Sequence, residues 1–354
     1  MKMTKEFREK LITYAIVVVA FLVVQIMIAT GSISSLMKGL LVPLCVYVIL
    51  AVSLNLTVGI LGELSLGHAG FMCVGAFTGA FFSKCTETVI TVAPLRFTLA
   101  ILIGAVSAGV IGFLIGMPVL RLKGDYLAIV TLAFGEIIKN FINVLYVGKD
   151  ANGIHVSMKD AASLNMEPDG LLIINGAQGI TGTPKDANFA VGFVLILLTL
   201  FIVLNLIKSR DGRAIMSIRD NLIAAESVGI HITKYKLMAF SISAALAGIA
   251  GVLYSHNLNS LMATPKNFGY NMSITILVFV VLGGIGNIRG SIISAVVLTL
   301  LPELLRGLND YRMLIYAVVL IVMMLFNWSP KLINWRKQHS IKKLFRQKKA
   351  KEVA

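Results

Sequence analysis

The sequence predicts an all-α polytopic membrane protein with about ten transmembrane helices. Hydrophobic residues make up 57% of the 354-residue chain and charged residues only 14%, whereas soluble domains carry about 25% charged residues. The apolar residues gather into runs close to the roughly 20 residues with which a helix crosses a bilayer. The three cysteines are scattered and form no CxxC pair, so we expect neither a disulfide framework nor a zinc site.

Each expected span is a helix, because irregular backbone cannot face lipid. The first follows a basic N-terminus as a secretory signal would, but its apolar run is too long for one, so we expect an uncleaved helix. The eighth and ninth are short, so one of them can be re-entrant or broken. The spans are Leu11–Ala29, Leu36–Val58, Leu64–Phe82, Phe97–Val119, Tyr126–Tyr146, Phe189–Ile207, Lys236–His256, Met272–Leu282, Ser291–Leu305 and Met313–Phe326.

Basic residues predict the orientation of these spans. Most of the 32 Lys and Arg lie in residues 1–10, 121–125, 208–236, 289 and 331–354. By the positive-inside rule these segments and both termini are cytoplasmic. The net charge of +15 is then explained by basic residues that orient the chain in the membrane, and we expect no nucleic-acid partner. Residues 11–330 then form one transmembrane domain. Its outer loop 148–187 is mildly acidic and rich in turn motifs, which predicts a small external cap, and residues 331–354 form a basic cytoplasmic tail near anionic lipid.

Motifs for catalysis are missing from the sequence. It has no GxxxxGK[ST] phosphate loop, no GxSxG, no HExxH and no paired-carboxylate motif. We therefore expect no enzymatic activity and no cofactor in this chain.

The loop 208–236 carries one short amphipathic helix in this prediction. Apolar residues at spacings of three and four share one helix face, with Arg219 and Glu226 off it; they are Ile215, Ile218, Leu222 and Ala225. Ser217 is the expected N-cap and Gly229 the expected stop. Such a helix either lies flat at the lipid interface or docks into a groove of a partner, with Ala224 and Ala225 allowing close approach and Ile218 and Leu222 filling a pocket.

Several motifs give the chain a family resemblance. Residues 223–229, IAAESVG, have the xAAxxxG spacing of the cytoplasmic coupling motif of ABC importer permeases, with Ile223 in place of the usual Glu. Five further stretches, in order along the chain, resemble branched-chain amino acid ABC transporter permeases of the LivM family: residues 54–59 (LNLTVG), 62–71 (GELSLGHAGF), 124–134 (GDYLAIVTLAF), 210–220 (RDGRAIMSIRD) and 282–290 (LGGIGNIRG). The outer loop departs from the family because only Asn152-Gly153 of its usual element is kept.

The resemblance implies an ABC importer permease fold and a bacterial inner-membrane, multi-pass location. It also implies four kinds of partner: a second, LivH-like permease subunit, LivG-like and LivF-like ATPase subunits that bind ATP and Mg, an external periplasmic or lipid-anchored binding protein, and membrane lipid. The residues implied to couple to the ATPases are Ser217, Ile218, Arg219, Leu222, Ala224, Ala225, Glu226 and Gly229.

Polar residues inside the spans are candidates for a translocation path, because an ionisable group in a bilayer is costly unless it faces protein or water. These candidates are Glu63, Ser65, His68, Thr131 and Glu136. Glu136 and Lys139 stand three apart on one helix face and are expected to neutralise each other, either as a packing pair or as part of the path.

Two other functions remain open from the sequence. Permeases for urea or short amides look very similar to this chain, and a stand-alone transporter driven by an ion gradient would use Glu63 or Glu136 as its cation site. A membrane-embedded enzyme would need convergent polar groups near one interface, and the sequence shows no such constellation.

Overall fold

Each of the ten predicted spans contains a helix in the computed structural model, which describes residues 5–31, 34–122, 124–167, 169–305, 307 and 311–328. The third span, predicted from Leu64, becomes helical only at His68. The chain forms two compact units, residues 1–296 and 297–354. The predicted tail 331–354 lies outside the described residues. The ten helices are α1 (Lys5–Ala29), α2 (Ser35–Asn55), α3 (His68–Cys85), α4 (Ala93–Val119), α5 (Asp125–Asn143), α6 (Phe189–Lys208), α9 (Ile232–Ser255), α11 (Tyr270–Gly283), α12 (Ile288–Leu304) and α13 (Arg312–Trp328).

Six of the described helical segments are long and apolar enough to cross a membrane on their own. One of the six combines the single turn α10 (Pro265–Phe268) with α11, and the two are separated at Gly269. The eighth predicted span, Met272–Leu282, lies within the continuous part of α11, and the break precedes it. The α2 segment is 89% buried inside the protein, whereas the Leu11–Ala29 part of α1 is only 11% buried. The described part of the protein is therefore a helical, multi-pass membrane protein built around α2.

Close contacts between small residues hold α3, α4 and α9 together. A Cβ atom at Gly75 of α3 would lie 2.3 Å from the carbonyl oxygen of Gly248 in α9. One at Gly248 would in turn lie 2.5 Å from the carbonyl oxygen of Gly104 in α4. Membrane helices associate through such small residues because packing, not water exclusion, drives them together. The three helices can approach this closely only because glycines, which have no side chain, occupy the contact positions.

One end of the first unit carries two small antiparallel sheets, which we call the sheet end. The first has the order β2-β1-β3, with β1 (Tyr146–Asp150), β2 (Gly153–Ser157) and β3 (Leu171–Asn175); the second pairs β4 (Ile180–Thr181) with β5 (Ser260–Leu261). Short 3₁₀ turns, η2 (Ala162–Leu164) and η3 (Gly176–Gln178), complete the segment. The turn motifs of residues 148–187 predict a small external cap but no strands, whereas this segment also forms β1 to β4.

Asp150 organises the β1–β2 turn. Its Oδ1 accepts the backbone N–H groups of Asn152 at 2.8 Å and Gly153 at 3.1 Å. Burial by itself would raise the pKa of the Asp150 carboxyl, but the Asn152 hydrogen bond and the neighbouring His155 bring this pKa below its ordinary value. An Asp that bonds the backbone two residues ahead is typical of a tight turn.

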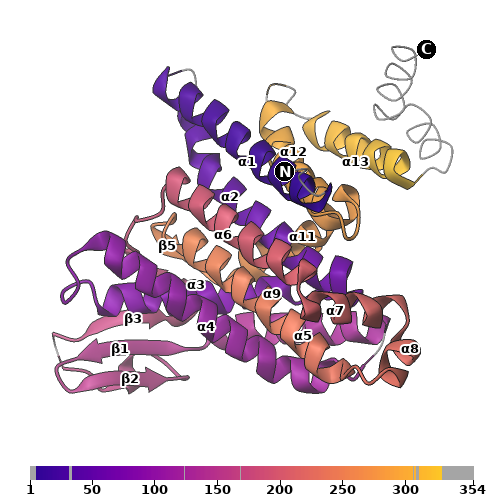
Figure 1. Cartoon of the computed structure of the whole chain (residues 1–354). Helices are drawn as coiled ribbons and strands as arrows, with labels where there is room; N and C mark the ends of the chain where they lie inside the picture. Colours follow the sequence, from indigo (N-terminus) through magenta and orange to yellow (C-terminus); the bar gives the residue numbers. More distant parts are fainter. Residues whose placement is uncertain are drawn as a thin grey trace, which may run out of the picture. The chain divides into compact units, whose positions relative to one another are not determined.

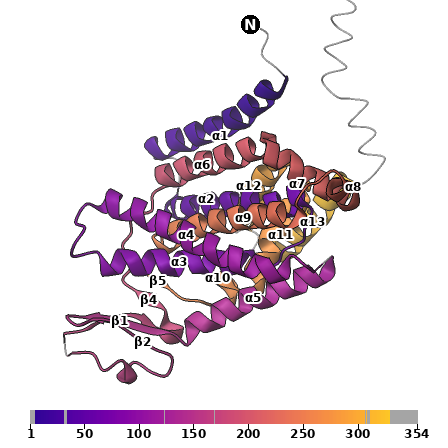
Figure 2. The same cartoon turned by 60° about the horizontal axis from the view of Figure 1, so that its bottom comes forward.

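Two short helices, α7 (Arg210–Asp220) and α8 (Leu222–Ser227), lie at the opposite end of the first unit, which we call the loop end. Figure 1 and Figure 2 both show α7 and α8 on the far side of the helices from the β1–β3 sheet. The segment with the coupling-motif spacing and the sheet therefore occupy opposite ends of the helical body.

Candidate functional site

An interruption between α2 and α3 forms the centre of the candidate site. α2 runs directly into a π-helix, η1 (Leu56–Leu61), which ends at Gly62 with φ +82. Residues 62–67 then run without regular structure until α3 begins at His68. A backbone of this kind is tolerated inside a membrane only where protein or water covers it. Here the cover comes partly from α5, because Thr131 Oγ1 accepts the N–H of Leu66 at 3.0 Å.

Ser65 and His68 are both almost fully buried in this interruption. The Nε2 atom of His68 lies 2.7 Å from Ser53 Oγ, and Ser53 donates its own hydroxyl proton to the carbonyl of Leu50. His68 is therefore tied to α2 through its ring. Ser65 Oγ is buried and has no hydrogen-bond partner among the described residues. A buried hydroxyl without a partner is unusual and marks a place for water or a polar group.

Glu136 and Lys139 form the ion pair that their spacing predicts. Glu136 also has a second partner that the sequence analysis missed, because its Oε1 accepts the backbone N–H of Tyr270 at 2.7 Å. Tyr270 is the first residue of α11, and the first N–H groups of a helix have no partner within it. The Glu136 carboxylate therefore joins α5 to the start of α11 as well as neutralising Lys139.

The second partner of Glu136 changes the expected result of exchanging the pair. In a Glu136→Lys/Lys139→Glu variant an ammonium faces the Tyr270 N–H, and two donors cannot bond each other. We expect the exchange to leave the protein less thermostable than a Glu136→Gln/Lys139→Met variant, whose amide still accepts from Tyr270. The midpoints of thermal unfolding in detergent measure the order of the two variants. Equal midpoints would show that the Tyr270 contact contributes nothing.

A second buried ion pair lies at the loop end of the interruption. Glu63 pairs with Lys236, which sits near the start of α9, and the two side chains are 15% and 5% exposed. Asn55, the last residue of α2, binds two groups farther along the chain: its Nδ2 donates to Ser291 Oγ at 2.8 Å and its Oδ1 accepts Gly286 N–H at 2.9 Å. Residues 282–290 resemble a family motif, but that resemblance did not predict the hydrogen bond between Asn55 and Gly286.

Arg219 connects α7 to the same region. Its Nη1 donates to the carbonyl oxygen of Gly59 at 3.0 Å, while Nε and Nη2 donate to Asp220 Oδ1 at 3.0 and 2.8 Å. A Cβ at Gly62 would lie 2.5 Å from the Cγ atom of Arg219, so only a glycine lets the arginine stem approach here. The loop-end helices are thus bonded directly to η1.

The loop 208–236 differs from the single helix that its spacing predicts. The chain forms two helices, because Asn221 adopts an extended conformation with φ −157 and ψ 104 between them. The prediction that Ser217 is an N-cap is wrong: Ser217 lies inside α7 and donates to the Ala214 carbonyl. The N-caps are Ser209 and Asn221, whose side chains accept from Gly212 N–H and Ala224 N–H. Gly229, with φ +84 just after α8, ends the second helix as predicted.

The two helices also expose a different face from the one expected. Ile218 and Ala225, predicted to meet a partner, are each 3% exposed and pack inside the protein. Leu222 is half-buried, and Ala224 and Glu226 are exposed. The large apolar side chains that this segment leaves open are Ile223 at 77% and Val228 at 75%. We call Ile223, Ala224 and Val228 the α8 tip; Ile223 stands at the position where the usual motif has Glu.

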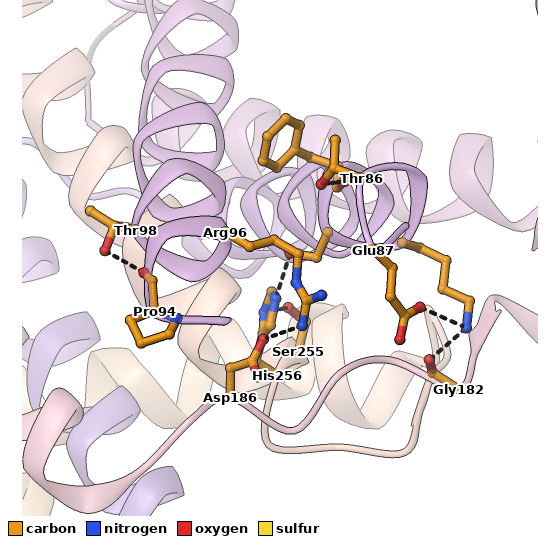
Figure 3. A network of polar contacts seen from close by, with 12 residues as sticks. Thr86, Glu87, Pro94, Arg96, Thr98, Gly182, Asp186, Ser255 and His256 are labelled. Atoms are coloured by element: carbon orange, nitrogen blue, oxygen red, sulfur yellow. Dashed lines mark hydrogen bonds and ion pairs between the residues drawn. The ribbon is translucent and has the colours of Figure 1, made fainter. Parts of the chain in front are cut away.

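A polar network secures the sheet end of the body (Figure 3). Arg96 in α4 pairs with Asp186 at 3.0 Å, just before α6. His256, at the end of α9, is fully buried next to them, with its Nε2 2.8 Å from Ser83 Oγ. Lys84 donates to the Gly182 carbonyl at 2.9 Å. These bonds join the β4 segment to α3, α4 and α9, so we assign them a structural role.

These features define a class: a multi-pass helical membrane protein with an interrupted helix at its core and a compact helical loop at one end. Comparison with known proteins gives the family. Residues 36–326 match the family described as branched-chain amino acid transport system / permease component, and the chain belongs to this family.

Curated relatives agree with this assignment. The chain is 35% identical over 334 residues to the high-affinity branched-chain amino acid transport system permease protein LivM of Salmonella typhimurium, covering 92% of this chain and 74% of that protein. It is 35% identical to LivM of Escherichia coli over 295 residues, or 81% and 67% of the two chains. A more distant relative is the autoinducer 2 import system permease protein LsrC of Yersinia enterocolitica, 27% identical over 151 residues, or 38% and 41%. No solved structure matches the chain.

Proposed function

We propose that this chain is a transmembrane subunit of an ATP-driven ABC importer for leucine, isoleucine and valine in a bacterial cell membrane. The observation that carries the proposal is the α7–α8 segment, which combines the coupling-motif spacing with an exposed α8 tip and a direct bond to η1. The α7–α8 end and both termini are cytoplasmic in this proposal, since the basic segments gather on that side. The sheet end is then external.

The chain itself has no role in binding ATP or another cofactor in this proposal. A LivG-like and a LivF-like ATPase hold ATP and Mg and contact the α8 tip, a LivH-like permease completes the path, and an external binding protein delivers the amino acid at the sheet end. Closing of the ATPase pair moves α7 and α8. Because Arg219 of α7 is bonded to Gly59 and covers Gly62, this movement reaches the interruption between α2 and α3 without an intermediate element.

Ser65, His68, Thr131, Glu63 and Glu136 have different roles within the proposed path. Ser65 has a free hydroxyl and is suited to contact a polar group in transit. Thr131 and His68 position the interruption through Leu66 and Ser53. Glu63 and Glu136 are both engaged by lysines, so neither offers a free carboxylate for an ion gradient. This occupancy favours an ATP-driven subunit over an ion-coupled transporter.

Uptake of radiolabelled leucine tests the proposal. A strain without its own branched-chain uptake should accumulate leucine when it receives this chain together with its sister permease, ATPases and binding protein. Excess isoleucine or valine should compete, and excess urea or acetamide should not. Competition by urea would instead indicate that the chain is a permease for urea or short amides. Leucine accumulation against a gradient in liposomes that contain this chain alone would overturn the proposal.

A further inference from the structure

The membrane-facing surfaces of the described helices are not alike. The exposed side chains of α4 between residues 101 and 117 are all apolar: Leu102, Ile103, Val106, Val110, Phe113, Leu114 and Met117. Such a surface suits lipid. On α5 and the start of α11, by contrast, polar side chains reach the surface among exposed apolar ones such as Ile137, Phe141 and Ile274. The polar ones are Asn140, Tyr270, Asn271 and Thr275, all exposed, and Glu136, whose side chain is 25% exposed. We call these five residues the α5–α11 polar face.

Hydrogen bonds between α5 and the segment before α11 place members of this face side by side. Glu136 bonds Tyr270 N–H at 2.7 Å, and one to two turns farther along α5 Asn143 Nδ2 donates to the Ala263 carbonyl at 3.0 Å. The segment 263–270 therefore runs along α5, with Asn140 between the two contacts. Asn140 is four residues from Glu136 and so shares its side of the helix. Asn271 follows Tyr270 directly.

The polar face follows the length of α5 and the first turns of α11. α5 has 19 residues and is about 28 Å long, and Glu136 lies about 16 Å from its first residue, somewhat past the middle of the helix. Asn140 stands about 6 Å from Glu136 toward the sheet end, and Thr275 about 7 Å from Tyr270 toward the loop end, by the rise per helical residue. The five residues thus form a stripe about 13 Å long, which is shorter than the roughly 30 Å hydrocarbon core of a bilayer.

The two amides on this stripe lack partners in the described part of the chain. Neither the Asn140 nor the Asn271 side chain has a hydrogen-bond partner among the described residues, whereas Thr275 donates to the Asn271 carbonyl at 2.8 Å. A polar group moved from water into an apolar medium loses its hydration, and without a hydrogen-bond partner nothing replaces it. The two amides are therefore poorly suited to contact lipid tails, and we expect water or another protein to cover them.

We propose that the α5–α11 polar face is the surface that this chain turns toward the second permease subunit, and that it forms one wall of the water-filled path between the two. The inference rests on the proposed function for the identity of that partner. An amide both donates and accepts, so Asn140 and Asn271 can meet the ammonium and the carboxylate of a zwitterionic amino acid in turn. The apolar surface of α4 faces lipid.

Cysteine accessibility in membranes that contain the whole transporter tests this surface. In a variant with Cys45, Cys73 and Cys85 replaced, single cysteines are introduced by Asn140→Cys and Asn271→Cys, with Ala133→Cys as a second α5 position. Val110→Cys on α4 and Phe201→Cys on α6 are matched exposed controls. The probe is a charged, water-soluble methanethiosulfonate. Only the thiolate form of cysteine reacts with this probe, and an apolar environment raises the thiol pKa, so that each unit of increase lowers the thiolate fraction about tenfold. The thiols of Asn140→Cys and Asn271→Cys should therefore react at least about tenfold faster than those of the controls.

Cross-linking identifies what covers the face. A short bifunctional thiol-to-photoreactive reagent placed on Asn140→Cys or Asn271→Cys should capture the second permease subunit, identified by mass spectrometry, whereas Val110→Cys should capture lipid. Capture of lipid alone or of a second copy of this chain, or reaction rates equal to the controls, would overturn the inference. If the transporter that lacks only Cys45, Cys73 and Cys85 takes up no leucine while labelling and cross-linking follow the expected pattern, the proposed function fails and this surface stands.

Discussion

An Ala224→Arg substitution is expected to abolish leucine uptake and to release the ATPase subunits while the chain stays in the membrane. Ala224 is exposed at the α8 tip, next to Ile223, which is 77% exposed. A long charged side chain there prevents close approach and places an unpaired charge at the centre of the contact. Single residues at the centre of an interface are worth about 2 kcal/mol or more, which is about thirtyfold in affinity. Co-purification of the ATPases with tagged chain, together with the uptake rate, measures the effect.

Two further alanines serve as controls for this experiment. Ala151 is exposed in the β1–β2 turn at the opposite end, so Ala151→Arg makes the same chemical change away from the tip and should leave ATPase association unaltered. Ala225 is 3% exposed, so Ala225→Arg should instead lower the amount of folded chain. Normal ATPase association in Ala224→Arg would show that the α8 tip is not the contact.

Loss of either member of the Glu63–Lys236 pair is expected to destabilise the protein strongly. The two side chains are 15% and 5% exposed, and removing one partner of a buried ion pair leaves an uncompensated charge that costs about 3–5 kcal/mol. Glu63→Gln and Lys236→Met should therefore each reduce the yield of folded chain and the midpoint of thermal unfolding. The exchange Glu63→Lys/Lys236→Glu should recover much of the loss, because it keeps both charges together.

An exposed pair gives the matched comparison. Lys84 and Glu87 lie 3.6 Å apart with side chains 20% and 47% exposed, and surface pairs contribute about 0–1 kcal/mol. Glu87→Gln should therefore have little effect on the unfolding midpoint. If Glu63→Gln behaves like Glu87→Gln, the Glu63–Lys236 pair is not the buried constraint described here.

Periodicity and apolar run length were sufficient to predict the ten helices, because a bilayer imposes a minimum length on every span. They were also sufficient to pair Glu136 with Lys139, since that contact is local. Contacts between distant segments were beyond the sequence. Lys236 meets Glu63, and Tyr270 meets Glu136, only after the helices have packed. For Glu63 and Lys236 the sequence did hold a usable signal, because an acid and a base lie at the same end of two predicted spans.

The loop 208–236 shows why a correct spacing gave an incorrect helix. Ile215, Ile218 and Leu222 follow a helical period, so a continuous helix was expected, but Asn221 can bond the N–H of Ala224 through its side chain. That bond begins a new helix and competes with continuation of the old one. The turn moves the apolar stripe onto the body of the protein and leaves Ile223 and Val228 outside. Capping chemistry, not periodicity, decides which face is open.

The bond between Arg219 and Gly59 has a consequence for biosynthesis. Gly59 lies in the last turn of η1, where backbone carbonyls lack N–H partners ahead of them, and the arginine that satisfies this one is 160 residues farther along the chain. The end of the second membrane helix therefore stays incompletely bonded until residue 219 has left the ribosome. The early helices can insert into the membrane before residue 219 is synthesised, but they can reach their final geometry only afterwards.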